Sequence, residues 1–245
     1  MSYFLLTTAA LGAGVINAVA GGGSFLTFPA LVFSGVPSIV ANATSTVALF
    51  PGVLTSAWAY RNEMKTLEIP VKAAIFASIA GGISGALLLL STSQQAFDAV
   101  IPWLLLAATI VFAIGPRVTT RFKRKSWIGP KALVIFHYSV GIYGGYFGGA
   151  VGIIILAVWS LAGLRDIHAM NAGRTLLGGL MNAAAVVLFI FARKVWWAQA
   201  AVMLVAAVMG GYAGARIARR VNPSLIRTAI IMFGLFATVA FFRRS

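Results

Sequence analysis

The residues best suited to bind a ligand form a polar stripe around Arg174, inside an otherwise apolar stretch of sequence. Asn171, Arg174 and Thr175 are spaced at i, i+3 and i+4, so they share one face of a helix. An arginine within a membrane segment costs at least about 2.5 kcal/mol without a partner. A guanidinium binds an oxyanion through parallel hydrogen bonds, so the sequence favours a bound anion as the counter-charge. The alternative is a tertiary contact between Arg174 and Asp98.

Two glycine-rich segments could add backbone donors to such a site. A triple glycine at 21–23 precedes Ser24 and Pro29, and a second cluster runs from Gly144 to Gly152. Glycines weaken a helix, and a helix that restarts after a break presents free N–H groups to an anion. Close packing of helices at small residues is the alternative role. The predicted binding residues are Gly22, Gly23, Ser24, Asn42, Ser45, Thr46, Gly149, Gly152, Asn171, Arg174 and Thr175.

Long apolar runs indicate the elements that must position these residues. About 20 apolar residues in a helix span the hydrocarbon core of a membrane. The predicted spans are 3–20, 38–60, 69–91, 97–115, 132–149, 167–192, 195–215 and 224–242. Two shorter apolar pieces, 24–35 and 150–164, follow the glycine clusters. They are predicted as re-entrant half-helices, second halves of broken helices, or short crossings that bring the total to ten segments.

The composition defines the class and excludes several others. Of the 245 residues 60% are hydrophobic and 9% are charged, which is too few for the polar surface of a soluble domain. The chain is therefore predicted to be an all-α polytopic membrane protein. The net charge of +15 arises from short basic runs between apolar stretches, which is typical of loops and not of a nucleic-acid-binding face. With no cysteine and no catalytic motif, we expect no metal, no cofactor and no enzymatic activity.

The chain contains two predicted structural repeats, offset by 129 residues. This shift superimposes Asn42 on Asn171 and Thr46 on Thr175, and it carries the Gly-Gly-x-x-Gly-Ala at 81–86 onto 210–215. Such repeats are typical of secondary transporters. The predicted domains are a first repeat (1–116), a basic cytoplasmic linker (117–131) and a second repeat (132–245). With eight crossings the pair at Arg193 and the C-terminal arginines share the side of the linker, whereas with ten they lie on the opposite side.

Two histidines could titrate near neutral pH. His137 lies near the start of its apolar run beside Tyr138, and His168 opens the helix that contains Arg174. For both, the sequence favours an interfacial position over a role in proton coupling. Trp196 and Trp197 are predicted to lie at the membrane interface next to Arg193.

The first repeat resembles a known family. The segments Gly-Val-Ile-Asn-Ala-Val-Ala-Gly-Gly-Gly-Ser at 14–24, Pro29, Gly-Val-Pro at 35–37 and Ala-Asn-Ala-Thr-Ser-Thr at 41–46 are similar to the sulfite exporter TauE/SafE family of membrane permeases. The second repeat departs from this pattern, since Pro29 falls on Val158 and Val36-Pro37 on Arg165-Asp166. The resemblance covers the whole chain and implies transport of sulfite or a small organosulfur anion.

Together these observations predict a multi-pass permease of the cell inner membrane. It exports a small sulfur-containing oxyanion, sulfite or an organosulfonate, by alternating access between the repeats. The alternatives are a proton-coupled importer of sulfonates or other organic anions, and a membrane scaffold that transports nothing. The expected partners are the anion and membrane lipid, with no nucleic acid, and a homodimer is compatible with the sequence.

Overall fold

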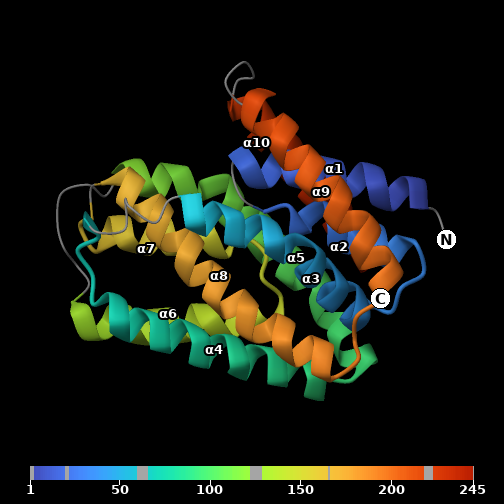
Figure 1. Cartoon of the computed structure of the whole chain (residues 1–245), viewed down its shortest axis with the longest axis horizontal. Helices are drawn as coiled ribbons and strands as arrows, with labels where there is room; N and C mark the ends of the chain where they lie inside the picture. The colour runs from blue at the N-terminus through green and yellow to red at the C-terminus, as the bar shows by residue number, and fades with distance from the viewer. Residues whose placement is uncertain are drawn as a thin grey trace.

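A computed structural model describes residues 3–19, 22–59, 66–121, 129–164, 166–217 and 223–244, and every element in these ranges is an α-helix (Figure 1). The helices are α1 (Tyr3–Val19), α2 (Ser24–Phe33), α3 (Ser38–Ala59), α4 (Val71–Ser91), α5 (Gln94–Arg121), α6 (Pro130–Tyr146), α7 (Val151–Leu161), α8 (Ile167–Phe191), α9 (Trp197–Ile217) and α10 (Pro223–Phe242). Residues 122–128 of the predicted linker 117–131 lie outside the described residues.

The long helices fall into two groups by their ability to span a membrane. Among the residues described, four segments are long and apolar enough to cross: Ser38–Ser56, Val71–Ser91, Gln94–Gly115 and His168–Phe191. Shorter apolar segments occur in α1, α2, α7, α9 and α10. All ten apolar runs form helices, so the prediction of an all-helical membrane protein is confirmed. Of the eight long spans that were predicted, these four are long and apolar enough among the described residues.

The direction of α7 distinguishes among the readings of the two short apolar pieces. Near the end of α6, Gly144 packs against Val151, the first residue of α7, and against Met181 of α8. Nearer the start of α6, His137 bonds to Trp159, close to the end of α7. Thus α7 runs back along α6, while α8 runs parallel to α6. The piece 150–164 is therefore not the second half of a broken helix, because α7 reverses the chain after the glycines.

The first short piece makes the same reversal. Gly12 of α1 packs against Leu26 of α2, and Gly23, just before α2, lies against the carbonyl oxygen of Ala13. Contacts that move back along α1 as the chain advances along α2 define an antiparallel pair. At 1.5 Å per residue, α2 and α7 are each only about 15 Å long, too short to cross the hydrocarbon core.

Glycine allows two helix pairs to pack with their backbones in contact. Gly81 and Gly85 of α4 lie against the backbone of α6 at Gly141 and Ile142, in parallel register. Gly14 of α1 and Gly210 of α9 make the corresponding close approach. A side chain at these positions would keep the helices apart, which is the role of small residues between membrane helices. Several of the glycines therefore serve helix packing.

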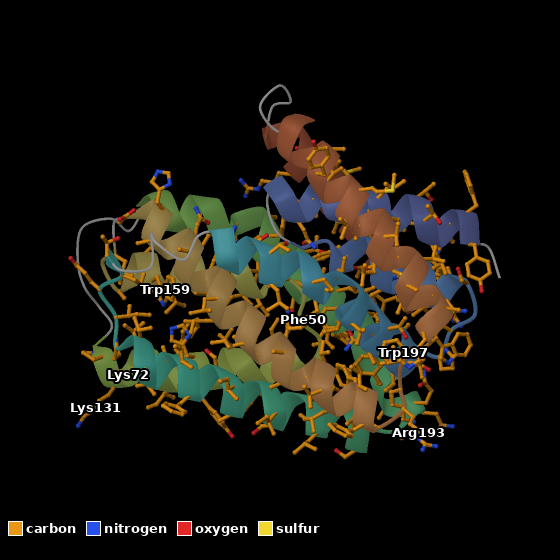
Figure 2. The ribbon with its side chains drawn as sticks, in the orientation of Figure 1. Phe50, Lys72, Lys131, Trp159, Arg193 and Trp197 are labelled. Carbon is orange, nitrogen blue, oxygen red and sulfur yellow. The ribbon has the colours of Figure 1, made fainter. Side chains whose placement is uncertain are left out.

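The surface of the bundle is apolar along its sides and charged at its ends. Large exposed side chains such as Phe76, Phe191 and Phe236 point outward, as lipid-facing residues do. Lys72 and Lys131 mark one end of the bundle, where α4 and α6 begin (Figure 2). Arg193 and Trp197 mark the opposite end. Trp197 is 59% exposed there.

Candidate functional site

The two helix breaks meet inside the bundle. Ser24 at the start of α2 and Gly149 just before α7 line the same internal space, together with Asn42 of α3. Phe25, Phe28, Leu105 and Phe147 form the rest of its wall. In this conformation it is too narrow to hold a water molecule. Three predicted binding residues from three separate segments thus come together in a closed, mostly apolar pocket.

At the first break, a side chain from α1 fixes the backbone turn. Gly22 has a φ of +98°, which glycine adopts without strain. The N–H of Gly23 donates to Asn17 Oδ1 at 2.7 Å, and the same glycine packs against the Asn17 side chain. The N–H of Gly23 is therefore already bonded within the protein. A direct role in ligand binding, as predicted for Gly23, requires Asn17 to release it.

Asn42 connects the first repeat to the second break. Its Nδ2 donates at 3.0 Å to the carbonyl oxygen of Tyr146, the last residue of α6. That carbonyl lies at a helix end, where no N–H of the same helix is available to it. Asn42 is only 4% exposed, so this hydrogen bond is shielded from water. The side chain thereby fixes the point at which α6 stops.

Ser45 and the two threonines of the predicted site bond locally. Ser45 Oγ lies 2.6 Å from Thr27 Oγ1, which joins α3 to α2. Thr46 donates to the carbonyl oxygen of Asn42, and Thr175 donates to that of Asn171, both at 2.8 Å. A hydroxyl that donates to a carbonyl oxygen of its own helix can still accept a hydrogen bond, but it has no proton left to donate to an anion. These three residues support the site and do not line the pocket.

At the second break, a guanidinium lies against the start of α7. Ala150 takes the left-handed conformation with a φ of +59°, and α7 begins directly after it. A Cβ added at Gly152 would lie 2.7 Å from Arg174 Nη1, so only glycine leaves room for the guanidinium. Arg174 Nε donates to Asn171 Oδ1 at 2.8 Å, which orients the side chain. Gly152, Asn171 and Arg174, all predicted binding residues, therefore lie together in one cluster.

This cluster concentrates positive charge. The N-terminus of a helix carries a partial positive charge and N–H groups that lack partners within the helix. A guanidinium beside these N–H groups forms a positively charged region that an anion can complement. The arrangement is therefore suited to an oxyanion that reaches Arg174 and the start of α7 together.

The acidic residues nearest in sequence have other partners. Asp98 accepts hydrogen bonds from Ser38 and from Gln94. Gly115, seventeen residues further along α5, packs against Ile153 beside the Arg174 cluster. That separation corresponds to about 25 Å along the helix. The alternative pairing of Asp98 with Arg174 is therefore wrong.

Asp166 caps α8 from outside the apolar segment. Its Oδ1 accepts from the N–H groups of His168 and Ala169 at 2.9 and 3.1 Å, and its Oδ2 accepts from Thr66. The N–H of Ala169 chiefly, with help from Thr66 and His168, holds the pKa of Asp166 below its ordinary value. The carboxylate thus serves as a helix cap.

His137 is buried inside the bundle and does not reach its surface. It is 0% exposed, and its Nε2 accepts a hydrogen bond from Trp159 Nε1 at 3.1 Å. The interfacial position predicted for it is wrong, because α7 folds back over α6 and covers the ring. His168 is exposed at the start of α8, as predicted.

Sequence reasoning missed the residues that shape the pocket without carrying charge. Phe28 and Phe147 stack edge to face across it, with ring centroids 5.8 Å apart. Asn17 lies within the motif at 14–24, but its hydrogen bond to Gly23 was not predicted. Its position six residues before Gly23 is the available signal, since a side chain at the end of α1 can reach a turn that folds back on it. Gly22 packs against Phe112 of α5.

The fold is that of a helical membrane protein in which two helix breaks meet at an internal, mostly apolar pocket. Residues 6–241 match the family described as "Sulfite exporter TauE/SafE". The chain belongs to this family, and it is a membrane transporter and not an enzyme.

Three similar proteins are named as probable membrane transporters. The chain is 32% identical to "Probable membrane transporter protein YfcA" of Escherichia coli strain K12, over 90% of this chain and 82% of that protein. It is 26% identical to a "Probable membrane transporter protein" of Haemophilus influenzae, over 92% and 89% of the two chains. A "Probable membrane transporter protein ORF9" of a Sinorhizobium species is 28% identical over 94% and 88%. No solved structure matches the chain.

Proposed function

We propose that the protein exports a small sulfur-containing oxyanion, sulfite or an organosulfonate, across the cell inner membrane. The observation that carries the proposal is the position of Arg174 against Gly152 at the start of α7. A guanidinium and a helix N-terminus that converge on one point favour an anion with several oxygens. The neighbouring pocket between Ser24, Asn42 and Gly149 supplies the space into which such an anion would move.

The closed pocket supports a mechanism of alternating access. A space too narrow for water cannot hold sulfite, so the walls must separate for the substrate to bind. The two breaks lie on opposite sides of this space and belong to different halves of the chain. Rocking one half against the other would open the pocket to one side of the membrane at a time.

Helix packing supports the two repeats on which this mechanism depends. An offset of 129 residues relates α1 to α6 and α4 to α9. In the first pair, α1 packs closely against α9; in the second, their counterparts α6 and α4 pack closely against each other. The two helix pairs are therefore equivalent under the offset. The offset also relates the bond from Thr46 to Asn42 to the bond from Thr175 to Asn171. Alternating helix directions then imply inverted repeats, with α2 and α7 as short returning segments.

The membrane potential supports export as the direction. With the inside negative, a single negative charge moving outward gains about 2.3 kcal/mol per 100 mV. Of the four candidate spans, α3, α4 and α8 contain no carboxylate that could carry a coupling proton or sodium ion, and α5 contains Asp98 near its start, where Ser38 and Gln94 donate to it. Outward movement of an anion needs no such ion, whereas import against the potential would.

Flux of sulfite, an organosulfonate and chloride into proteoliposomes under an imposed potential tests the proposal. We expect potential-driven flux of the sulfur anions and little flux of chloride. Arg174→Ala should reduce sulfite flux by about tenfold or more, since a charge-assisted hydrogen bond contributes about 1.5–3 kcal/mol. Arg174→Lys should recover part of it, because the charge remains while the paired donors are lost.

Lys72→Ala is the matched control, since it removes an exposed positive charge at the start of α4. It should transport as the wild type does. Absence of sulfur-anion flux in the wild type, or full flux in Arg174→Ala, would contradict the proposal.

A further inference from the structure

His137 and Trp159 form a buried hydrogen bond that the proposed anion site does not use. Both side chains are 0% exposed, and Trp159 Nε1 donates to His137 Nε2 at 3.1 Å. Because Nε2 accepts, the neutral ring carries its proton on Nδ1. Nδ1 has no hydrogen-bond partner among the described residues. A buried donor without an acceptor is energetically costly, so a conformation that gives Nδ1–H an acceptor would lower the free energy of this ring.

A second buried polar atom without a partner lies on the helix packed against α6. Ser78 of α4 is 0% exposed, and its Oγ also has no partner in the described part of the chain. The carbonyl oxygen of Ser78 lies against Gly141, one helical turn after His137. The α4 and α6 helices therefore bring two unsatisfied polar side chains to neighbouring levels of one interface.

Trp159 connects this histidine to the cluster around Arg174. A Cβ added at Gly173 would lie 2.7 Å from the Trp159 ring, and Gly173 directly precedes Arg174. Gly152, which accommodates the Arg174 guanidinium, lies seven residues before Trp159 and so shares its face of α7. The Trp159 indole thus holds α7 against both α6 and α8, and any change at His137 acts on α7.

The helices around His137 provide no acid to stabilise a charged ring. The titratable or charged residues on α4, α7 and α8 are the exposed Lys72 of α4, with His168 and Arg174 of α8; α7 has none. The segment before α4, whose Leu67 joins the same apolar cluster as Trp159, carries Glu68, and this side chain is exposed. On α6 itself they are Lys131, Tyr138, Tyr143 and Tyr146. A proton added to Nε2 would face the Trp159 N–H, a donor opposite a donor. The protonated ring is therefore incompatible with the observed contact.

We infer that His137 is a proton-binding site that controls the position of α7. A proton from solvent binds Nε2, the bond to Trp159 is lost, and α7 is freed to move relative to α6 and α8. Neutral His137 holds the closed pocket and protonated His137 favours its opening. Transport therefore becomes faster at acidic pH, where the imidazole takes up a proton. This inference goes beyond the proposed function, because it applies to whichever anion is carried.

A spectroscopic experiment tests the site without reference to the substrate. His168→Gln leaves His137 as the one histidine, so its ¹⁵N ring signals can be followed by NMR in nanodiscs between about pH 8 and pH 5. We expect the Nδ1–H tautomer at high pH, conversion to imidazolium at low pH, and a simultaneous shift of the Trp159 indole signal. Trp159→Phe assigns that signal. A ring that stays neutral throughout, or titrates while the indole signal remains unchanged, overturns the inference.

Flux measurements provide the second test. In the wild type and in His168→Gln, flux should rise by up to about tenfold per pH unit on the alkaline side of the transition, in proportion to the protonated fraction. His137→Gln, whose side chain keeps an acceptor for Trp159, should be slow and independent of pH. Trp159→Phe should be fast at pH 7.5, because the restraining bond is absent. A wild-type pH profile in His137→Gln overturns the inference, and the NMR result stands even if sulfite is not the substrate.

Discussion

At the scale of single residues, Asn42 and Arg174 have different roles in the candidate site. Asn42 uses its amide to satisfy a carbonyl at the end of α6, whereas Arg174 adds charge at the start of α7. Their positions are linked by the four residues between Tyr146 and Val151. An anion that enters here would meet one side chain that fixes the break and another that supplies the attraction.

Asn42→Asp should abolish anion flux while Asn42→Ala should only weaken it. Both lose the donor to the Tyr146 carbonyl, which leaves a buried acceptor unsatisfied at a cost of about 1–3 kcal/mol. The aspartate adds a negative charge beside the pocket and repels the substrate as well. Flux and thermal unfolding of both variants in detergent measure the two effects separately. Equal flux from the two variants would mean that no anion passes Asn42.

The α7 helix is the element on which the site depends. Its start receives the Arg174 guanidinium, and its far end contacts α6 and α8 through Trp159. An 11-residue helix has little intrinsic stability in isolation, so its position is set by these tertiary contacts. Such an element can move without unfolding its longer neighbours.

Glycine packing between α4 and α6 can be tested with a matched pair of variants. A Cβ at Gly85 would overlap the backbone of α6, whereas nothing lies within 4 Å of a Cβ at Gly178. Gly85→Ala should destabilise the protein by about 1–3 kcal/mol through forced separation of the helices. Gly178→Ala should be neutral or stabilising by up to about 1 kcal/mol, since alanine favours the helix. Thermal unfolding in the same detergent measures both, and similar losses would refute the close-packing argument.

The cap at the start of α8 predicts a dependence of stability on pH. Because hydrogen bonds lower the pKa of Asp166 in the folded protein, the ionised carboxylate stabilises folding above its unfolded value of about 3.9. This contribution is lost as the pH falls through the lower folded value. Asp166→Asn still caps the helix but does not titrate, so its melting temperature should fall less between pH 7 and acid than that of the wild type. An identical pH dependence in both proteins would show that ionisation of Asp166 does not contribute to the loss of stability in acid.

At the scale of the whole molecule, helix direction determines which ends of the helices share a side of the membrane. The α4 and α6 helices begin at the end marked by Lys72 and Lys131, and α9 begins near Trp197 at the other end (Figure 2). The chain terminates with α10 at that second end (Figure 1). Successive helices thus run in opposite directions. This arrangement favours the topology in which the C-terminus and the linker lie on opposite sides of the membrane.

Reporter fusions test this topology directly. A reporter after Arg244 and one inserted beside Trp196 should both be outside, and one within the linker 117–131 should be cytoplasmic, because basic loops stay inside. A topology with eight crossings instead predicts all three in the cytoplasm. A cytoplasmic C-terminal reporter with a cytoplasmic linker would therefore contradict the alternation of ten segments.

The sequence determined the helices, the membrane environment and the residues that could bind an anion. Runs of apolar residues report burial in lipid directly, and this is why the predicted segments agree with the ten helices. The spacing of Asn171 and Arg174 within one helix likewise required only the helical repeat. These properties are local, so neighbouring residues in the chain are enough to define them.

Only the tertiary structure decided how the segments come together. Sequence could not show that α7 folds back along α6, because the glycines at 148–149 permit many backbone directions and packing selects one. That reversal buried His137, which was expected at the interface, and brought Gly152 against Arg174. It also left Asp98 with Ser38 and Gln94. Contacts between distant segments depend on the path of the whole chain, and the composition of each segment does not contain that path.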